Sequence, residues 1–342
     1  MTITGLGTYV PGRAVTNDDL ATSLDTSDGW IRQRTGIAER RIADAGVSSS
    51  DLGILAAREA LTDARLDPAR VDLVVTASIS PDQIMPATAA RVAYGCGCGN
   101  AGAFDVSAGC AGFVYALAMA AAAVASGVRE NVLVVGAEAI SRVIDWQDRS
   151  TAILFGDAAG AAVVSTLRGA ARPVPAGILG FDLGGDGSGA DSIQIPAGGS
   201  RMPASCETVQ DRQHYLKMNG KEVYKFATRV VTHSAKRVLA QCGRRVDDID
   251  LFVPHQANLR IIEAAVAKLG LPQEKVYTNL QKYGNTSSAS IPLCLSEARA
   301  EGRLKDGDLV LLMGFGAGLS WGSCLMEWGT GTGASPSEDG RV

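Results

Sequence analysis

One cysteine lies where a strand-like stretch gives way to a helix-like one. Residues 103–106 form a short β-rich run, and residues 111–125 are almost entirely small, aliphatic or aromatic, which predicts a buried helix. Cys110 therefore falls on the first turn of that helix, where unpaired N–H groups and the helix dipole lower the pKa of a thiol. Gly109 and Gly112 let another molecule approach the backbone. A free cysteine is often only a core residue, but this position favours a nucleophile.

Two further groups and a glycine turn come from the C-terminal half. Among the three histidines, His255 alone follows an apolar strand-like run, residues 249–253, and so lies at the strand end where α/β folds gather their sites. Asn285 belongs to the turn sequence Gly-Asn-Thr-Ser, and the spaced glycines of residues 314–318 free N–H groups to face a ligand. Taken singly, the Asn turn is more often a turn with a helix cap.

Together these groups form a set suited to acyl transfer. A thiolate can attack a thioester while two backbone N–H groups hold the oxyanion. A neutral imidazole and a carboxamide can both donate to a second thioester carbonyl, which would stabilise an enolate formed by decarboxylation. This chemistry needs no metal and no redox cofactor.

Residues 26–37 offer a candidate nucleotide contact. Trp30 provides a flat stacking surface, and Arg34 could meet a phosphate. The alternative is a capped helix in which the tryptophan packs and the arginines are solvated.

Composition predicts an ordinary globular protein. The chain has 342 residues, 46% of them hydrophobic and 20% charged, with a net charge of −4, which argues against general nucleic-acid binding. The longest apolar run, residues 111–124, is too short to span a bilayer, and the first residues lack the basic region of a secretory signal. With seven cysteines and no such signal, we expect a cytoplasmic protein without a disulfide framework.

The two halves of the chain echo one another. The sequence Asp72-Leu-Val-Val corresponds to Asp250-Leu-Phe-Val, and the run from Asn131 corresponds to that from Asp308. Strands and helices alternate in each half, which predicts mostly parallel sheets with right-handed crossovers. We expect an N-terminal half, residues 1–167, that carries the cysteine, and a C-terminal half, residues 168–328, that carries the histidine and asparagine. Residues 184–205 should form a long loop that covers a site, and residues 329–342 a disordered tail.

Four motifs in this order resemble the β-ketoacyl-acyl carrier protein synthase III family of thiolase-fold condensing enzymes. They are Ala-Gly-Cys-Ala-Gly-Phe at 108–113, Pro-His-Gln-Ala-Asn-Leu-Arg at 254–260, Gly-Asn-Thr-Ser at 284–287 and Gly-Phe-Gly-Ala-Gly-Leu-Ser-Trp-Gly at 314–322. The resemblance extends over essentially all of residues 1–328. It implies an α/β, thiolase-like, internally duplicated fold, layered α-β-α-β-α around two mostly parallel, five-stranded mixed sheets.

The resemblance also implies roles for particular residues. Cys110 resembles the acylated nucleophile, His255 and Asn285 resemble the pair that promotes malonyl decarboxylation, and the N–H groups of Cys110 and Ala317 resemble the oxyanion hole. The remaining positions fall where the family binds its substrates: Trp30 and Arg149 around the adenine of coenzyme A, Thr26 and Arg34 nearby, Gly220 and Phe226 along the pantetheine channel, and Lys225 and Arg260 toward the acidic carrier protein.

Two positions depart from the family pattern. Met85 stands where an aromatic residue often closes the acyl pocket across a dimer interface, so the primer preference could be wider or different. Ala317 replaces a frequent glycine, which is harmless if only its N–H group is used.

The implied reaction is a ping-pong decarboxylating condensation of an acyl-CoA primer with a malonyl-carrier protein, which starts fatty acid or polyketide synthesis. The implied partners are acyl-CoA, the acyl carrier protein and a second copy of the chain. One alternative keeps the nucleophile but transfers the acyl group to a hydroxyl or amine, and another is a non-catalytic carrier-binding subunit, which the presence of Cys110 disfavours. A metal site at Cys96 and Cys98 is weaker still, because one residue separates them and no second Cys/His pair completes four ligands.

Overall fold

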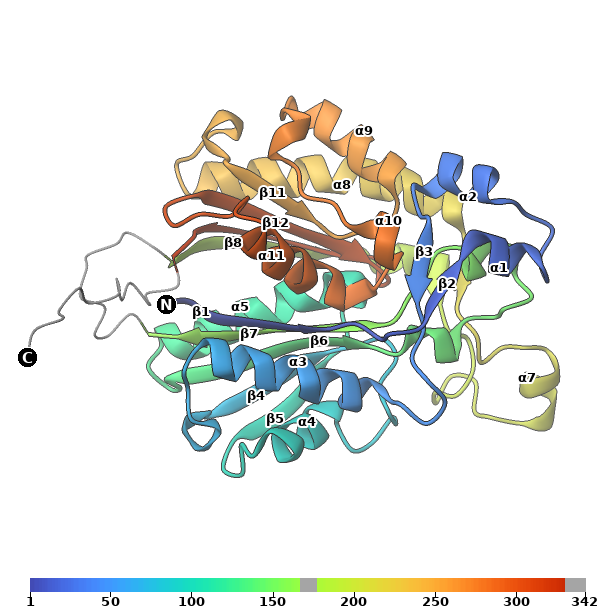
Figure 1. The fold of residues 1–342 in the computed structure, drawn as a ribbon, viewed down its shortest axis with the longest axis horizontal. Helices are drawn as coiled ribbons and strands as arrows, with labels where there is room; N and C mark the ends of the chain where they lie inside the picture. The colour runs from blue at the N-terminus through green and yellow to red at the C-terminus, as the bar shows by residue number, and fades with distance from the viewer. Residues whose placement is uncertain (167–176, 330–342) are drawn as a thin grey trace, which may run out of the picture.

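This computed structural model describes residues 1–166 and 177–329. The chain folds into five layers of helices and sheets. Helices α3 (Ser49–Asp63) and α4 (Thr88–Cys96) cover the outer face of one sheet, and α8 (Gly220–Gln241) covers the outer face of the other (Figure 1). Helices α5 (Gly112–Ala125) and α11 (Ser290–Ala300) contact both sheets and form the central layer. The predicted order α-β-α-β-α is therefore confirmed.

The remaining elements run in chain order. In the N-terminal half they are β1 (Thr2–Tyr9), β2 (Ala14–Thr16), α1 (Asn17–Ala21), α2 (Asp28–Thr35), β3 (Glu39–Arg41), β4 (Leu73–Ala77), β5 (Gly102–Val106), β6 (Asn131–Glu138), α6 (Arg149–Ala152) and β7 (Ala158–Ser165). In the C-terminal half they are β8 (Gly177–Gly185), β9 (Ile193–Gln194), α7 (Cys206–Gln210), β10 (Lys217–Met218), β11 (Leu251–Pro254), α9 (Leu259–Leu269), α10 (Leu280–Tyr283), β12 (Leu309–Gly316) and β13 (Ser320–Glu327).

The prediction of two mostly parallel, five-stranded sheets is wrong in detail. The first sheet has five strands in the order β1-β7-β6-β4-β5, and only β6–β4 and β4–β5 are parallel pairs. The second has four, in the order β11-β12-β13-β8, and only β11–β12 is parallel. The alternation of strands and helices concealed two antiparallel connections, because β6 leads to β7 and β12 leads to β13 without a crossover helix. At the fifth position of the second sheet stands a single parallel bridge between Phe252 and Val276.

The duplication inferred from the sequence is confirmed by the strand order. Strands β4 and β11 hold corresponding places in the two sheets, as do β6 and β12. The aspartate that precedes each repeat even makes the same contact: Asp72 accepts the backbone N–H of Asn131 at 3.0 Å, and Asp250 accepts that of Leu309 at 2.9 Å. The predicted boundary at 167/168 lies outside the described residues, as does nearly all of the predicted tail.

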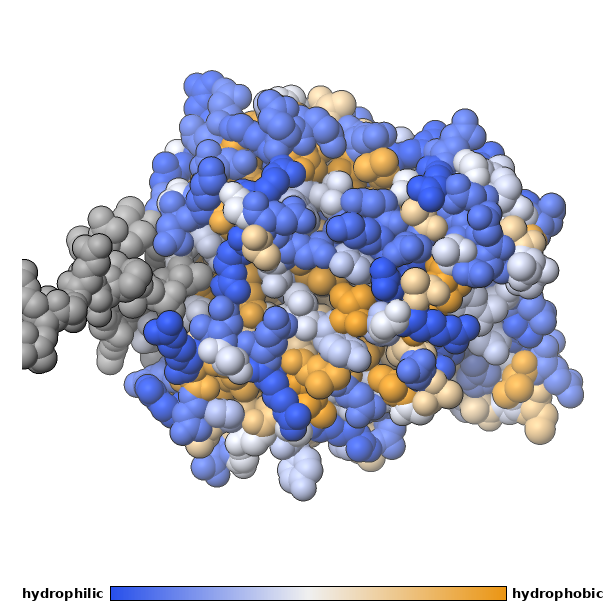
Figure 2. Space-filling view, in the orientation of Figure 1, coloured by the Kyte–Doolittle hydropathy of each residue, from blue (hydrophilic) through white to orange (hydrophobic). Residues whose placement is uncertain are grey.

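Burial explains why the helices differ in composition. Helix α5 lies between two sheets and needs apolar residues on most of its surface, whereas α8 covers one sheet and is amphipathic. Figure 2 shows that hydrophilic residues cover most of one face of the molecule and that hydrophobic ones gather in small patches. Within the described ranges, no helix is both long and apolar enough to cross a membrane.

Residues 184–205 are not the structureless loop predicted. They contain the end of β8, a 3-10 helix at Gly187–Ser192, and β9, which pairs with β10. Ile193 of β9 and Met218 of β10 nevertheless line a cavity, so the expectation that this segment covers a site is met.

Candidate active site

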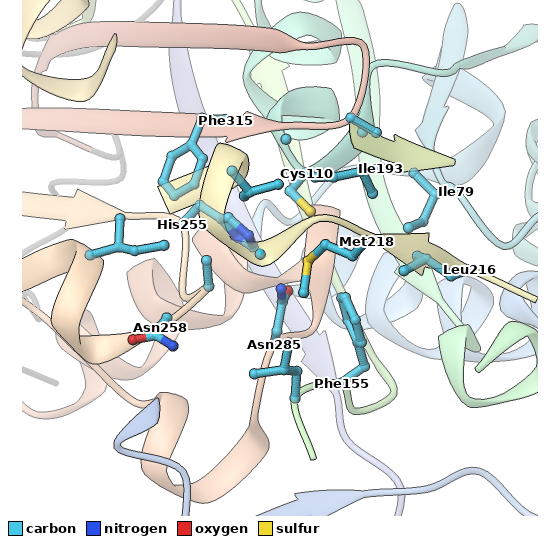
Figure 3. Close-up of a pocket in the computed structure, with 18 of the residues that line it drawn as sticks. Ile79, Cys110, Phe155, Ile193, Leu216, Met218, His255, Asn258, Asn285 and Phe315 are labelled. Atoms are coloured by element: carbon cyan, nitrogen blue, oxygen red, sulfur yellow. The ribbon is translucent and has the colours of Figure 1, made fainter. Parts of the chain in front are cut away.

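A cavity of about 730 Å³, its mouth included, lies where the two halves meet. Cys110 comes from the turn between β5 and α5, His255 follows β11, and Asn285 follows α10. Figure 3 shows the three side chains around the same space, with Phe315, Met218 and Ile79 on its walls. The sequence-predicted trio is thus brought together from segments up to 175 residues apart (Cys110 to Asn285).

Cys110 lies in a 3-10 turn, Gly109–Ala111, that precedes α5. The turn is pressed against β12, because a Cβ on Gly316 would lie 3.2 Å from Cys110 Sγ and 2.6 Å from its backbone nitrogen. The thiol is only 9% exposed, and burial raises its pKa to about 12. The expected lowering of this pKa is therefore wrong, since loss of water outweighs the polar groups near the turn.

The two proposed oxyanion donors lie on adjoining turns. Gly109 has a φ of +55°, and a Cβ there would approach the Ala317 nitrogen to 2.6 Å, so only glycine permits this contact. Among the described residues, neither the Cys110 nor the Ala317 N–H donates to a turn or loop carbonyl. Ala317 itself lines the cavity. Two N–H groups are therefore available beside the thiol.

His255 is buried and neutral. It is 1% exposed, and burial lowers the pKa of its imidazole to about 3. Its Nδ1 lies 2.8 Å from the Ser290 hydroxyl, and its ring packs edge-on against Phe315. The neighbouring Gln256 donates to the carbonyls of Pro254 and Tyr277, which fixes the chain after β11.

Asn285 is held by its main chain and by one side-chain atom. Its N–H donates to Leu154 at 2.8 Å, its carbonyl accepts from Gly156 at 3.1 Å, and its Oδ1 accepts the Ser287 N–H at 2.8 Å. The carboxamide therefore cannot rotate freely, and Nδ2 is left to donate into the cavity.

One predicted channel residue does not line this cavity. Gly220 lines the cavity, but Phe226 is 5% exposed and packs on Trp321, with ring centroids 6.0 Å apart. Tyr224 lines the cavity instead. Two residues along a helix differ by about 200° in direction, so Phe226 faces the core when Tyr224 faces the cavity. The spacing from Gly220 (i, i+4 on one helix face) was the signal for Tyr224 that the sequence reading missed.

The predicted coenzyme A residues form a cluster beside the mouth. The guanidinium carbons of Arg34 and Arg149 lie 4.7 and 4.9 Å from the Trp30 ring centroid. Asn258, which lines the cavity, donates to the Arg34 carbonyl at 3.1 Å and so connects this cluster to the site. Thr26 lies nearby in sequence, and its buried hydroxyl has no partner among the described residues.

The predicted carrier-protein and acyl-pocket residues are exposed. Lys225 on α8, paired with Glu222 at 2.9 Å, and Arg260 on α9 belong to the helices that bring Tyr224 and Ile261 to the cavity. Met85 is 83% exposed and does not line the cavity of the single chain.

The cysteines at 96 and 98 are buried thiols. Burial raises the pKa of Cys96 to about 12 and of Cys98 to about 11. Within residues 1–166 and 177–329, no group of three or more His, Cys, Asp or Glu is placed to hold a metal ion.

Comparison with known proteins identifies the family. Models described as 3-oxoacyl-[acyl-carrier-protein] synthase III and its C-terminal region match residues 104–187 and 239–328. The chain is 53% identical over 329 residues to the β-ketoacyl-[acyl-carrier-protein] synthase III of Symbiobacterium thermophilum, covering 96% of this chain and 98% of the relative.

Solved structures agree with this match. The synthase III of Thermus thermophilus superposes with a TM-score of 0.87 at 47% identity, over 96% of this chain and all (100%) of the other. The priming β-ketosynthase of the R1128 polyketide pathway superposes with a TM-score of 0.86 at 40% identity, over 95% of each chain. The chain belongs to the β-ketoacyl-acyl carrier protein synthase III family of thiolase-fold condensing enzymes.

Proposed function

We propose that this condensing acyltransferase joins an acyl-CoA primer to malonyl-acyl carrier protein in two half-reactions at one cavity. The observation that carries the proposal is the meeting of Cys110, His255 and Asn285 beside two available backbone N–H groups. The product is a β-ketoacyl-carrier protein, the first intermediate of a fatty acid or a polyketide.

In the first half-reaction Cys110 takes the acyl group. Its sulfur forms a bond to the thioester carbon, the bond from that carbon to the CoA sulfur breaks, and the thiol proton leaves with CoA. The N–H groups of Cys110 and Ala317 hold the negative oxygen of the tetrahedral intermediate. Because the thiol is neutral at rest, this transfer of the proton is part of the barrier.

In the second half-reaction His255 and Asn285 act on the malonyl group. Both donate to the thioester carbonyl while the C–C bond to the carboxylate breaks and CO₂ leaves. The enolate carbon then attacks the acyl-Cys carbonyl, and the Cys110 thiolate leaves and takes a proton from solvent. This step needs the His255 proton on Nε2, so the Ser290 hydroxyl, which lies 2.8 Å from Nδ1 and donates to the Ser287 carbonyl, must turn to donate to Nδ1 instead.

Substrate binding uses the residues beside the mouth. Trp30, Arg34 and Arg149 offer a stacking surface and two cations for the nucleotide of CoA. Lys225 and Arg260 offer cations to an acidic carrier protein. Cysteine, histidine and asparagine supply the whole chemistry, so the reaction needs no resident cofactor or metal.

The partner of the chain is a second copy. Strand β5 ends the first sheet, and its outer edge lies near apolar side chains that a single chain leaves open: Ile84 is 85% exposed, Met85 83% and Tyr94 88%. Covering such residues together with an open strand edge stabilises a dimer. All seven cysteines are free thiols, which suits a reducing cytoplasm.

The test separates the two half-reactions. Purified wild type and Cys110→Ala are incubated with acyl-CoAs of several lengths and then with malonyl-carrier protein, and acyl-enzyme, CO₂ and product are measured by mass. We expect Cys110→Ala to form neither acyl-enzyme nor product, and His255→Ala to form acyl-enzyme but little CO₂. Full condensation by Cys110→Ala would refute the assignment, and acylated wild type that releases no CO₂ would favour transfer to a hydroxyl or amine.

A further inference from the structure

Ser287 combines a strained backbone with a buried, unsatisfied hydroxyl. It has a φ of +49°, a left-handed conformation that residues other than glycine rarely adopt, and it is fully buried (0% exposed). Its Oγ makes no formed hydrogen bond with any residue that the structure describes. Burying a hydroxyl without a partner is unfavourable, and so is the backbone conformation that places it there.

The main chain of Ser287 contacts the other polar groups of the site. Its N–H donates to Asn285 Oδ1 at 2.8 Å. Its carbonyl oxygen lies 2.9 Å from the Ser290 hydroxyl, which is the group beside His255 Nδ1. The left-handed turn at Ser287 therefore satisfies both backbone groups and sends the side chain in a third direction.

The 3-10 turn that begins at Ser287 (Ser287–Ala289) packs against the turn that holds Cys110 and against β6, which holds Glu138. The Ser287 hydroxyl opposes the effect of burial on both side chains, lowering the pKa of the Cys110 thiol and of the Glu138 carboxyl. Glu138 is already served by other donors, among them the hydroxyls of Ser80 at 2.6 Å and Ser288 at 2.7 Å. Cys110 Sγ has no other side-chain donor within the described chain.

We propose that Ser287 is a fourth catalytic residue, whose hydroxyl donates a hydrogen bond to Cys110 Sγ whenever that sulfur carries negative charge. The inference rests on the proposed role of Cys110 as the acylated nucleophile. A hydroxyl hydrogen turns freely about its C–O bond, so the Ser287 hydroxyl, which has no formed hydrogen bond in the resting site, turns to donate once the sulfur carries negative charge.

Ser287 keeps its own proton throughout. During acylation the S–C bond forms at Cys110, the C–S bond to CoA breaks, and the thiol proton leaves with CoA, as described above. During condensation the C–S bond to Cys110 breaks and the sulfur takes a proton from solvent. In both steps negative charge develops on a largely buried sulfur, so one oriented donor has a large effect.

Two substitutions separate the hydroxyl from the backbone. Ser287→Ala removes Oγ but keeps the strained conformation, whereas Ser287→Gly removes Oγ and relieves the strain. Neither leaves a new unpaired group, because the Ser287 backbone bonds remain and Glu138 keeps its other donors. Ser290→Ala is the control, because it removes a hydroxyl three residues on that contacts His255 Nδ1 and the Ser287 carbonyl but not Cys110.

The measurements distinguish an effect on the Cys110 sulfur from an effect on the Asn285 carboxamide. Alkylation of Cys110 by iodoacetamide between pH 7 and 9, followed on the Cys110 peptide, reports how readily the thiolate forms. Glu138 of β6 and His255 after β11 are the titratable side chains that face this thiol in the described chain, and all the variants retain both. Formation of the acyl-enzyme reports the first half-reaction, and CO₂ release in a Cys110→Ala background reports decarboxylation without the sulfur.

We expect both Ser287 variants to slow alkylation and acylation by about 10- to 100-fold, the effect of one hydrogen bond to a charged group, while CO₂ release falls less than about threefold. Ser290→Ala should show the reverse preference. Acylation within about twofold of wild type in both Ser287 variants would overturn the proposal, as would recovery in Ser287→Gly alone or an equal loss of CO₂ release. The proposed function fails on a different result, retention of condensation by Cys110→Ala.

Discussion

The substitution Asn285→Asp exchanges one NH₂ group for oxygen at nearly constant volume. The three contacts that position Asn285 all survive, because two use its backbone and the third uses Oδ1, which accepts the Ser287 N–H at 2.8 Å. What disappears is the Nδ2 donor that faces the cavity. The variant therefore tests the donor without disturbing the fold around it.

The expected magnitude follows from the charge that this donor meets. Removing one oriented donor from a developing oxyanion slows a reaction by about 10² to 10³-fold. An ionised aspartate adds repulsion toward the enolate, so decarboxylation should fall by at least about 300-fold at pH 8. Acylation uses the N–H groups of Cys110 and Ala317 and should change by less than about fivefold, well below the effect of losing such a donor.

The pH dependence of the variant gives a second test. A carboxyl in this buried position has a raised pKa, and below that pKa it is neutral and its O–H can donate. Decarboxylation by Asn285→Asp should therefore recover as the pH falls from 8 to 5, whereas Asn285→Ala, which has no donor at any pH, should not recover.

The assay measures the two half-reactions on the same enzyme. Acyl-enzyme is quantified by intact mass after addition of acyl-CoA, and CO₂ is collected after malonyl-carrier protein is added. Equal losses in acylation and decarboxylation would mean that Asn285 supports the shape of the cavity and is not an enolate donor. An Asn285→Asp variant that decarboxylates at the wild-type rate at pH 8 would refute the reasoning outright.

Three more outcomes are expected. Burial holds the pKa of His255 at about 3 against 6.5 in the unfolded chain, so only the unfolded chain takes up this proton at intermediate pH. The free energy of unfolding should then fall by about 1.4 kcal/mol per pH unit below 6.5. Urea titrations at several pH values measure this dependence, and a His255→Gln variant whose unfolding free energy depends on pH as the wild type's does would contradict it. Gly316→Ala puts a Cβ 2.6 Å from the Cys110 nitrogen, which should displace that turn and slow acylation by at least about 100-fold, and an unchanged acyl-enzyme burst would disprove it. Phe226→Ala should lower stability by about 3–5 kcal/mol in a thermal melt with little change in KM for acyl-CoA. Tyr224→Ala should raise this KM with little change in stability, and the reverse pattern would place Phe226 at the cavity.

Two of the three proposed catalytic groups were predictable from a local signal. Cys110 falls between a strand-like and a helix-like run, and His255 follows an apolar strand through a proline. Strand β5 ends before Cys110 and β11 ends before His255, so the α/β pattern places each group at a strand end. The two strands belong to different sheets, and the packing of the sheets brings the groups together. Asn285 needed the family motif, because its turn sequence has an ordinary structural explanation.

Other features depend on contacts that no local pattern encodes. Strands β7 and β13 run antiparallel to their neighbours β6 and β12, and the run of apolar residues in a buried strand is the same in either direction. The raised pKa of Cys110 comes from the second half of the chain closing over it, which an argument from the helix end alone omits. In the sequence Ser287 is an ordinary turn residue, and only its positive φ and its complete burial in the structure distinguish it.

The protonation of the site fits decarboxylation better than simple thiol catalysis. A cationic imidazole would hold the malonyl carboxylate by charge and stabilise the group that must leave, whereas a neutral His255 donates to the thioester carbonyl and favours the enolate. When the malonyl group arrives, Cys110 is a thioester and carries no charge. The raised pKa of the free thiol therefore bears on acylation and on the departure of the sulfur after condensation, and both steps depend on donors that act only while charge is present on the sulfur.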